Sequence, residues 1–170
     1  MGYKTILTVI TSEDQQVQLD AAIDVTRRED AHLEVFCLGV DHSQAGYYYA
    51  GASAYVFQET IDRAMASAQD LETKVRDRLS AEDIRWSVDS AVAQVGGLTT
   101  LIGMRARYSD LVVLTRPYGE TAPADAVAVT EAALFEGSAP VLIVPDTGLP
   151  ADSGQTVMIA WNQSEEAMTA

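Results

Sequence analysis

The chain has 170 residues, 48% hydrophobic and 21% charged, which is typical of one globular domain, or one domain with a fragment, and excludes a disordered chain. With 11 lysines and arginines against 25 aspartates and glutamates, the net charge is −14; such a field repels phosphate and anionic lipid, so we expect no nucleic-acid and no membrane partner. A single cysteine excludes an internal disulfide scaffold, and without a membrane-spanning run or a signal peptide a cytoplasmic location is expected.

The first part of the chain predicts a strand, a helix and a second strand. Residues 4–10 are apolar and β-branched, as in a buried strand. Ser12 followed three residues later by Gln15 has the pattern of a capping box and predicts a helix start there. The inner face of that helix is expected at Leu19, Ala22, Ile23 and Thr26. Residues 33–40 are apolar on both alternating sets, which indicates a strand covered on both faces.

A loop at residues 41–53, with tyrosines at 47–49, leads into the longest helical pattern. Its apolar stripe steps by three or four residues through Phe57, Ile61, Ala64, Ala68, Leu71, Val75 and Leu79. Residues 84–92 then alternate between apolar and polar side chains, which favours an edge strand.

The remaining elements follow the same alternation. A short helix is predicted around residues 98–105, a central strand at 110–115 and a loop at 116–124. Residues 124–135 predict a helix, with Gly137 as its stop signal. The fifth strand, at residues 140–145, is bounded by prolines, which favours a sheet edge. The whole order predicts an α/β fold with a five-stranded parallel sheet and helices on both faces.

The end of the chain carries a broken repeat. Residues 147–155 have the composition of a linker after a domain at 1–146. Residues 156–170 then resemble the start of the chain, with Thr156-Val157-Met158 matching Thr5-Ile6-Leu7 and Asn162 falling where Thr11 stands. Two interpretations are open: the first strand and helix start of a truncated second domain, which we favour, or a C-terminal strand that docks on the same sheet.

In open parallel sheets, ligands bind beyond the carboxyl ends of the strands. The candidates there are Thr11 and Ser12, Val40 and Asp41, and residues 115–119. No lysine stands near the fifth strand for a phospho-receiver, the first turn has no glycine for a flavodoxin phosphate loop, and Rossmann, Walker and G-x-S-x-G motifs are absent from the sequence. His32 and His42 have no ligand cluster and Cys37 lies in a strand, so neither a metal site nor a catalytic residue is expected.

Several segments in order resemble the universal stress protein family. They are KTILTVITSED at the start, ARYSDLVVLT at residues 106–115, EAALFEGSAPVLIVP at 131–145 and VMIAWNQSEEA at 157–167. The resemblance implies sheet order 3-2-1-4-5, an adenine nucleotide alpha hydrolase-like, Rossmann-like fold, a role in stress tolerance, and assembly as a homodimer or as a pseudo-dimer with a second domain. Some members of the family bind ATP through a strand-1 aspartate and a G-x-x-G loop followed by Gly-Ser or Gly-Thr.

This sequence departs from that nucleotide pattern at each position. Thr11 stands for the aspartate, Thr115 and Tyr118 for the two loop glycines, and Val127-Ala128 for the Gly-Ser pair. Gly119 remains beside Tyr118, and Arg116 is a candidate anion partner. Glycines let backbone N–H groups close on a phosphate, so their loss predicts a degenerate site and no ATP cofactor.

Three functions follow as hypotheses. The first is a non-catalytic stress-response module that dimerises, with a degenerate nucleotide site in this domain. The alternative is an adenine-nucleotide-binding switch that uses Thr11, Val40, Arg116 and Gly119 in an altered way. The third, an unrecognised α/β enzyme, has no acid–base or nucleophile constellation to support it.

Overall fold

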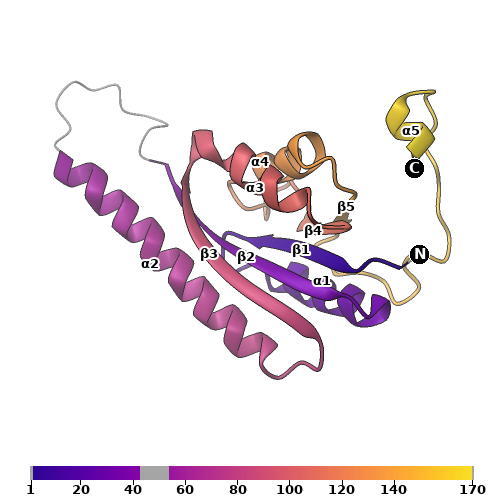
Figure 1. The fold of residues 1–170 in the computed structure, drawn as a ribbon, viewed down its shortest axis with the longest axis horizontal. Coiled ribbons are helices and arrows are strands. Elements are labelled where there is room, and N and C mark those ends of the chain that lie inside the picture. Colours follow the sequence, from indigo (N-terminus) through magenta and orange to yellow (C-terminus); the bar gives the residue numbers. More distant parts are fainter. Residues whose placement is uncertain (1, 43–53, 170) are drawn as a thin grey trace.

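A computed structural model describes residues 2–42 and 54–169, so the tyrosines at 47–49 and the side chain of Phe57 lie outside the described part. The elements alternate between strand and helix as predicted (Figure 1). In chain order they are β1 (Thr5–Ile10), α1 (Gln16–Glu29), β2 (His32–Asp41), α2 (Ala54–Leu79), β3 (Arg85–Gln94), the 3-10 turn η1 (Val95–Gly97), α3 (Leu98–Ala106), β4 (Leu111–Thr115), α4 (Ala126–Glu131), the π-helical turn η2 (Ala132–Glu136), β5 (Val141–Val144) and α5 (Glu165–Thr169).

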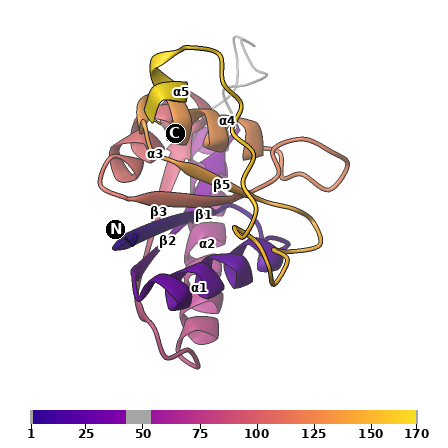
Figure 2. The ribbon, with the colours of Figure 1, turned by 90° about the vertical axis from the view of Figure 1, so that its right-hand side faces the viewer.

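The five strands form one parallel sheet in the order β3-β2-β1-β4-β5. Helices α1 and α2 cover one face, and α3, α4 and η2 cover the other (Figures 1 and 2). The predicted fold class, strand order and edge positions of β3 and β5 are therefore confirmed.

The central strands are buried on both faces, because their side chains alternate between the two faces and helices cover each of them. In β1, Ile6 and Ile10 pack toward α1 and α2, while Leu7 and Val9 pack toward α3 and α4. Cys37 is fully buried in β2, and that burial raises the pKa of its thiol to about 12. It is a core residue and not a reactive thiol, as predicted.

One helix boundary differs from the sequence prediction, and another is confirmed with a different local geometry. Helix α1 begins at Gln16, because the side chain of Gln15 folds back onto the end of β1 before the helix starts. The predicted stop at Gly137 is confirmed, because η2 ends at Glu136 with Gly137 as its C-cap; Gly137 has a φ of −78°, and the left-handed residue is Ser138. Gly137 is needed for packing, because a Cβ there would meet Ala106 and lie 2.6 Å from the carbonyl oxygen of Ala133.

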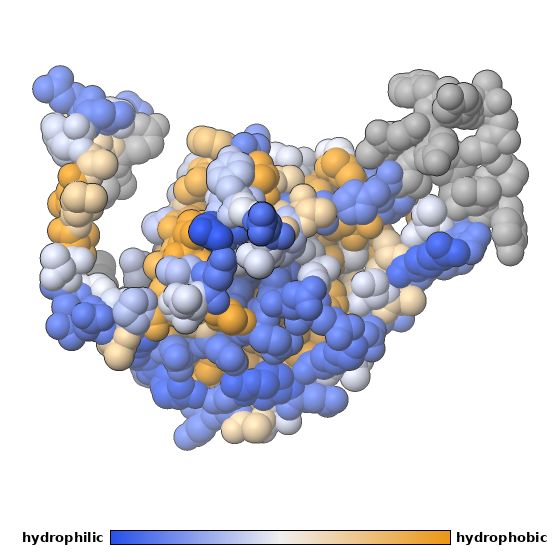
Figure 3. All heavy atoms as spheres, turned by 180° about the vertical axis from the view of Figure 1, so that it is seen from behind, coloured by the Kyte–Doolittle hydropathy of each residue, from blue (hydrophilic) through white to orange (hydrophobic). Residues whose placement is uncertain are grey.

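Beyond β5, the connector runs along α1: Gly148 lies against Val17, and Ser153 accepts a hydrogen bond from Arg28 (Figure 2). Residues 157–164, where a further strand was predicted, form neither helix nor strand, and α5 follows. Their apolar side chains are exposed on a segment that stands apart from the body (Figure 3); they are Val157, Met158, Ile159 and Trp161. A second domain starting here stays a prediction.

Across the residues that the structure describes, no helix is both long enough and apolar enough to cross a bilayer.

Candidate functional site

The candidate site lies where the strand order reverses. After β1 the chain builds β2 and β3 on one side, then returns to place β4 on the other side of β1. Because β1 and β4 are parallel neighbours, with Thr8 level with Val113, their carboxyl ends meet at one edge of the sheet. This is the switch point where doubly wound sheets bind ligands.

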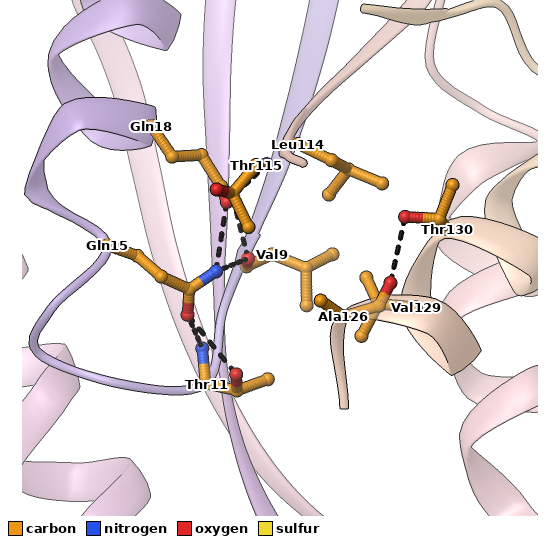
Figure 4. A pocket seen from close by; sticks show the side chains of 9 residues that line it. All are labelled: Val9, Thr11, Gln15, Gln18, Leu114, Thr115, Ala126, Val129 and Thr130. Carbon is orange, nitrogen blue, oxygen red and sulfur yellow. Dashed lines mark hydrogen bonds between the residues drawn. The ribbon is translucent and has the colours of Figure 1, made fainter. Parts of the chain in front are cut away.

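The edge holds a hollow of about 10 Å³, which is about the space of one water molecule (Figure 4). Its lining comes from β1, α1, β4 and α4: Val9, Thr11, Gln15, Gln18, Leu114, Thr115, Ala126, Val129 and Thr130. Of the residues predicted from the sequence, the structure brings only Thr11 and Thr115 together here.

Gln18 fills the space between the two strand ends. Its side chain is 1% exposed, and its Nε2 donates to Thr8 Oγ1 and to the carbonyl oxygen of Val9, both at 2.8 Å. Its Oε1 accepts the backbone N–H of Thr115 at 2.7 Å. One buried amide therefore satisfies polar groups of β1 and β4 together.

Gln15 closes the turn after β1 in the same way. Its Oε1 accepts the backbone N–H groups of Thr11 at 2.7 Å and Ser12 at 2.9 Å. Its Nε2 donates to Gln18 Oε1 at 2.9 Å, which joins the two amides into one network (Figure 4). Three backbone donors at this edge, those of Thr11, Ser12 and Thr115, are thus already bonded to glutamine oxygens.

The positive charge in the loop after β4 is paired with a carboxylate that follows β5. Arg116, the candidate anion partner, lies 2.6 Å from Asp146 through its Nη2, and Thr121 donates to the same carboxylate. Gly119 has a φ of +124°, and a Cβ there would lie 2.8 Å from Arg116 Nη2. Tyr118 is 68% exposed.

The other predicted residues lie around the hollow without lining it. Val40 and Asp41 are the last residues of β2, and the side chain of Asp41 is buried. Val127 and Ala128 are half-buried in the first turn of α4, whose Ala126 and Val129 line the hollow instead. The sequence analysis did not assign the two glutamines to the site. The signal was Gln18, a polar residue on the predicted apolar face beside Leu19 and Ala22.

The chemistry available at this edge is hydrogen bonding by amides and hydroxyls. His42 lies 3.5 Å from Asp125 and links the end of β2 to the start of α4. Within the described ranges, no group of three histidine, cysteine or carboxylate side chains has the geometry of a metal site.

Solved structures of universal stress proteins share this fold. The protein from Lactobacillus plantarum aligns over 84% of this chain and 98% of its own, with a TM-score of 0.62 and 17% identity. A family member from Burkholderia pseudomallei aligns over 84% of this chain and 96% of its own, with a TM-score of 0.57 and 16% identity. The Archaeoglobus fulgidus protein in complex with dAMP aligns over 84% of this chain and 98% of its own, with a TM-score of 0.54 and 12% identity. This likeness defines the chain as having the universal stress protein fold.

A comparison of the sequence with protein-family models found no match, and neither did a comparison with curated proteins.

Proposed function

We propose that this chain is a non-catalytic, cytoplasmic stress-response module of the universal stress protein type, whose nucleotide site is closed in this domain. The observation that carries the proposal is the pair of amides from Gln15 and Gln18, which hold the backbone N–H groups of Thr11, Ser12 and Thr115. A phosphate that used these three donors would have to displace a buried, fully bonded amide. Losing a buried hydrogen-bond partner costs about 1–3 kcal/mol for each group left unsatisfied.

The second candidate function is an adenine-nucleotide switch. Two neighbours in fold favour it, because one is a universal stress protein in complex with cAMP and another was solved in complex with dAMP. For this chain the candidate needs the amides to move aside when nucleotide arrives. The two functions therefore differ in one measurable property, the response of the strand-end amides to nucleotide.

The test is a titration of the protein with ATP, cAMP and dAMP, followed by calorimetry and by the backbone amide signals of Thr11 and Thr115 in NMR spectra. We expect no heat of binding and no shift of these signals, because their hydrogen bonds stay within the protein. Stoichiometric binding with shifts at Thr11 and Thr115 would establish the switch instead. Binding without those shifts would place the nucleotide elsewhere and leave this edge closed.

We propose that the module assembles through β5. This strand pairs with β4 on one side and is at the sheet edge on the other. Exposed apolar side chains lie on and near it, with Ile143 at 36%, Leu134 at 43% and Phe135 at 76% exposure. The occupant is a second copy of the chain or, in a tandem protein, the second domain that the repeat at residue 156 predicts.

Light scattering tests the assembly. Ile143→Lys is expected to shift a dimer toward monomer, because it places a charge on the exposed edge. Met65→Lys, on an exposed position of α2, is the matched control and should leave the mass unchanged. A monomeric wild-type protein contradicts assembly between two copies of this chain and leaves a second domain as the occupant of the β5 edge.

A further inference from the structure

A larger hollow lies at the opposite end of the sheet, beside the amino ends of β1 and β4. It has a volume of about 220 Å³ and sits between α1, the sheet and the connector after β5. Its apolar walls come from Val25, Leu111, Leu142 and Leu149, which all pack at the core on the α1 side. An apolar cavity of about 150 Å³ holds one benzene-sized molecule, so this hollow has room for such a body with a small polar head.

Arg28 stands at this hollow and is electrostatically unusual. Within the described residues, the other arginines and Lys74 form ion pairs with carboxylates, and Arg28 and Lys4 do not. The Arg28 guanidinium instead donates a hydrogen bond to the hydroxyl Oγ of Ser153 at 3.2 Å. A positive group without a carboxylate partner is unusual in a chain of net charge −14. A carboxylate would make a stronger, charge-assisted bond than that hydroxyl does.

Glu29 supplies the opposite charge at the same hollow. One of its oxygens, Oε2, accepts the backbone N–H of Tyr3 at 3.3 Å, which holds the side chain near the start of the chain. A simple carboxylic acid bound at Arg28 would be repelled by Glu29, and a simple amine would be repelled by Arg28. A molecule that carries an ammonium group and a carboxylate on the same carbon satisfies both residues.

We propose that the hollow binds a free apolar α-amino acid of about the size of leucine. Its carboxylate lies at Arg28, its ammonium group at Glu29, and its side chain against Val25, Leu142 and Leu149. The inference is independent of the proposed function, because this hollow lies at the other end of the sheet from Gln15 and Gln18.

The experiment uses three probes that share one apolar body. They are L-leucine, 4-methylpentanoate, which lacks the ammonium group, and 3-methylbutylamine, which lacks the carboxylate. Each is titrated into the whole chain, and the methyl signals of Leu111, Leu142 and Leu149 are followed by NMR. We expect leucine to shift these signals and to bind up to about fivefold more tightly than either analogue, the gain that one partly exposed ion pair provides.

Two surface variants assign the charges without disturbing the core. Arg28→Ala should remove the advantage of leucine over 3-methylbutylamine, and Glu29→Gln should remove its advantage over 4-methylpentanoate. Arg27→Ala is the matched control, because Arg27 pairs with Asp24 and Glu82 and does not line the hollow, so leucine affinity should not change. The proposal is overturned if leucine leaves the three methyl signals unmoved, if an analogue binds as well as leucine, or if the two variants have no effect.

Discussion

The two ends of the sheet treat their backbone donors differently. At the carboxyl end, the neutral amides of Gln15 and Gln18 accept the N–H groups of Thr11, Ser12 and Thr115 and fill the space between β1 and β4. At the amino end, the carboxylate of Asp110 accepts the N–H groups of Lys4 and Thr5 at 2.7 and 2.9 Å, and a hollow stays open nearby.

The difference teaches that fold position alone does not make a binding site. Doubly wound sheets bind ligands at their carboxyl ends because backbone donors and space meet there. In this chain Gln15, in the turn before α1, and Gln18, in its first turn, extend into that space and bond to three of its backbone donors. At the amino end α1 is joined by a connector instead of a second helix, and the packing leaves room.

The largest effect is expected when the closed end is opened. Gln18→Ala removes the partner of Thr115 N–H and one acceptor bond of Val9, so we expect the free energy of unfolding to fall by about 3 kcal/mol. Urea denaturation measures the change. Gln16→Ala, exposed on the same helix, is the control and should stay within about 0.5 kcal/mol of wild type. A small loss for Gln18→Ala would show that the amide network is not what holds this end closed.

At the amino end of the sheet, the connector after β5 contributes Leu149 to the wall of the hollow. Leu149 is half-buried against the α1 side of the core, so Leu149→Ala should lower the free energy of unfolding by about 1 kcal/mol and weaken leucine binding. Val157→Ala, farther along the same segment and 73% exposed, is the control for both measurements. If stability and leucine affinity were both unchanged, the connector would not be part of the hollow.

The side chains that accept backbone N–H groups at the two ends of the sheet also differ in their response to acid, because the carboxylate of Asp110 titrates and the glutamine amides do not. The N–H groups of Lys4 and Thr5 hold the pKa of Asp110 below its usual value of 3.8. A lowered pKa in the folded state means that this carboxylate stabilises the fold above about pH 4, and that the contribution is lost as the pH falls through the folded-state pKa. Asp110→Asn should therefore be less stable than wild type near neutral pH, with a gap that narrows below pH 4.

Thermal melts from pH 2 to 7 check this response. Asp77→Asn, at an exposed aspartate on α2 outside these contacts, is the matched control. A gap between wild type and Asp110→Asn that stayed constant with pH would mean that Asp110 acts through shape and not through charge.

The smallest effect is expected at the Arg116–Asp146 pair. Both side chains are about half exposed, so Asp146→Asn should change the free energy of unfolding by less than about 1 kcal/mol. It releases Arg116 but leaves the glutamine amides in place, so ATP should still give no heat in calorimetry. ATP binding by this variant would show that the ion pair, and not the amide network, closes the site.

Much of the fold could be predicted because local patterns and burial agree. The two-sided apolar character of residues 33–40 indicated a central strand, the alternation after Ile84 an edge strand, and the prolines around β5 the other edge. The start of α1 was misplaced because the Ser12–Gln15 spacing fits a capping box. The Gln15 side chain does reach back to Ser12, but three residues form a turn before the helix begins.

The site was harder to predict than the fold. The loss of glycines at Thr115, Tyr118 and Val127 indicated a degenerate nucleotide site, but it did not show what occupies the space. Gln18 stands beside Leu19 in the sequence, and its partners Thr8 and Thr115 lie 10 and 97 residues away. No local pattern reports such contacts.

The sequence by itself determined the strands and helices between residues 5 and 144 and which strands lie at the centre, because those choices depend on hydrophobic periodicity within a few residues; the same pattern after residue 156 did not form a strand. The tertiary structure alone decided that glutamine amides bond to the backbone donors at one end of the sheet, while the other end keeps a hollow lined by Arg28 and Glu29. Those outcomes depend on strand register and on side chains that meet across the fold, and hydrogen bonds and cavities are formed only when distant segments are brought together.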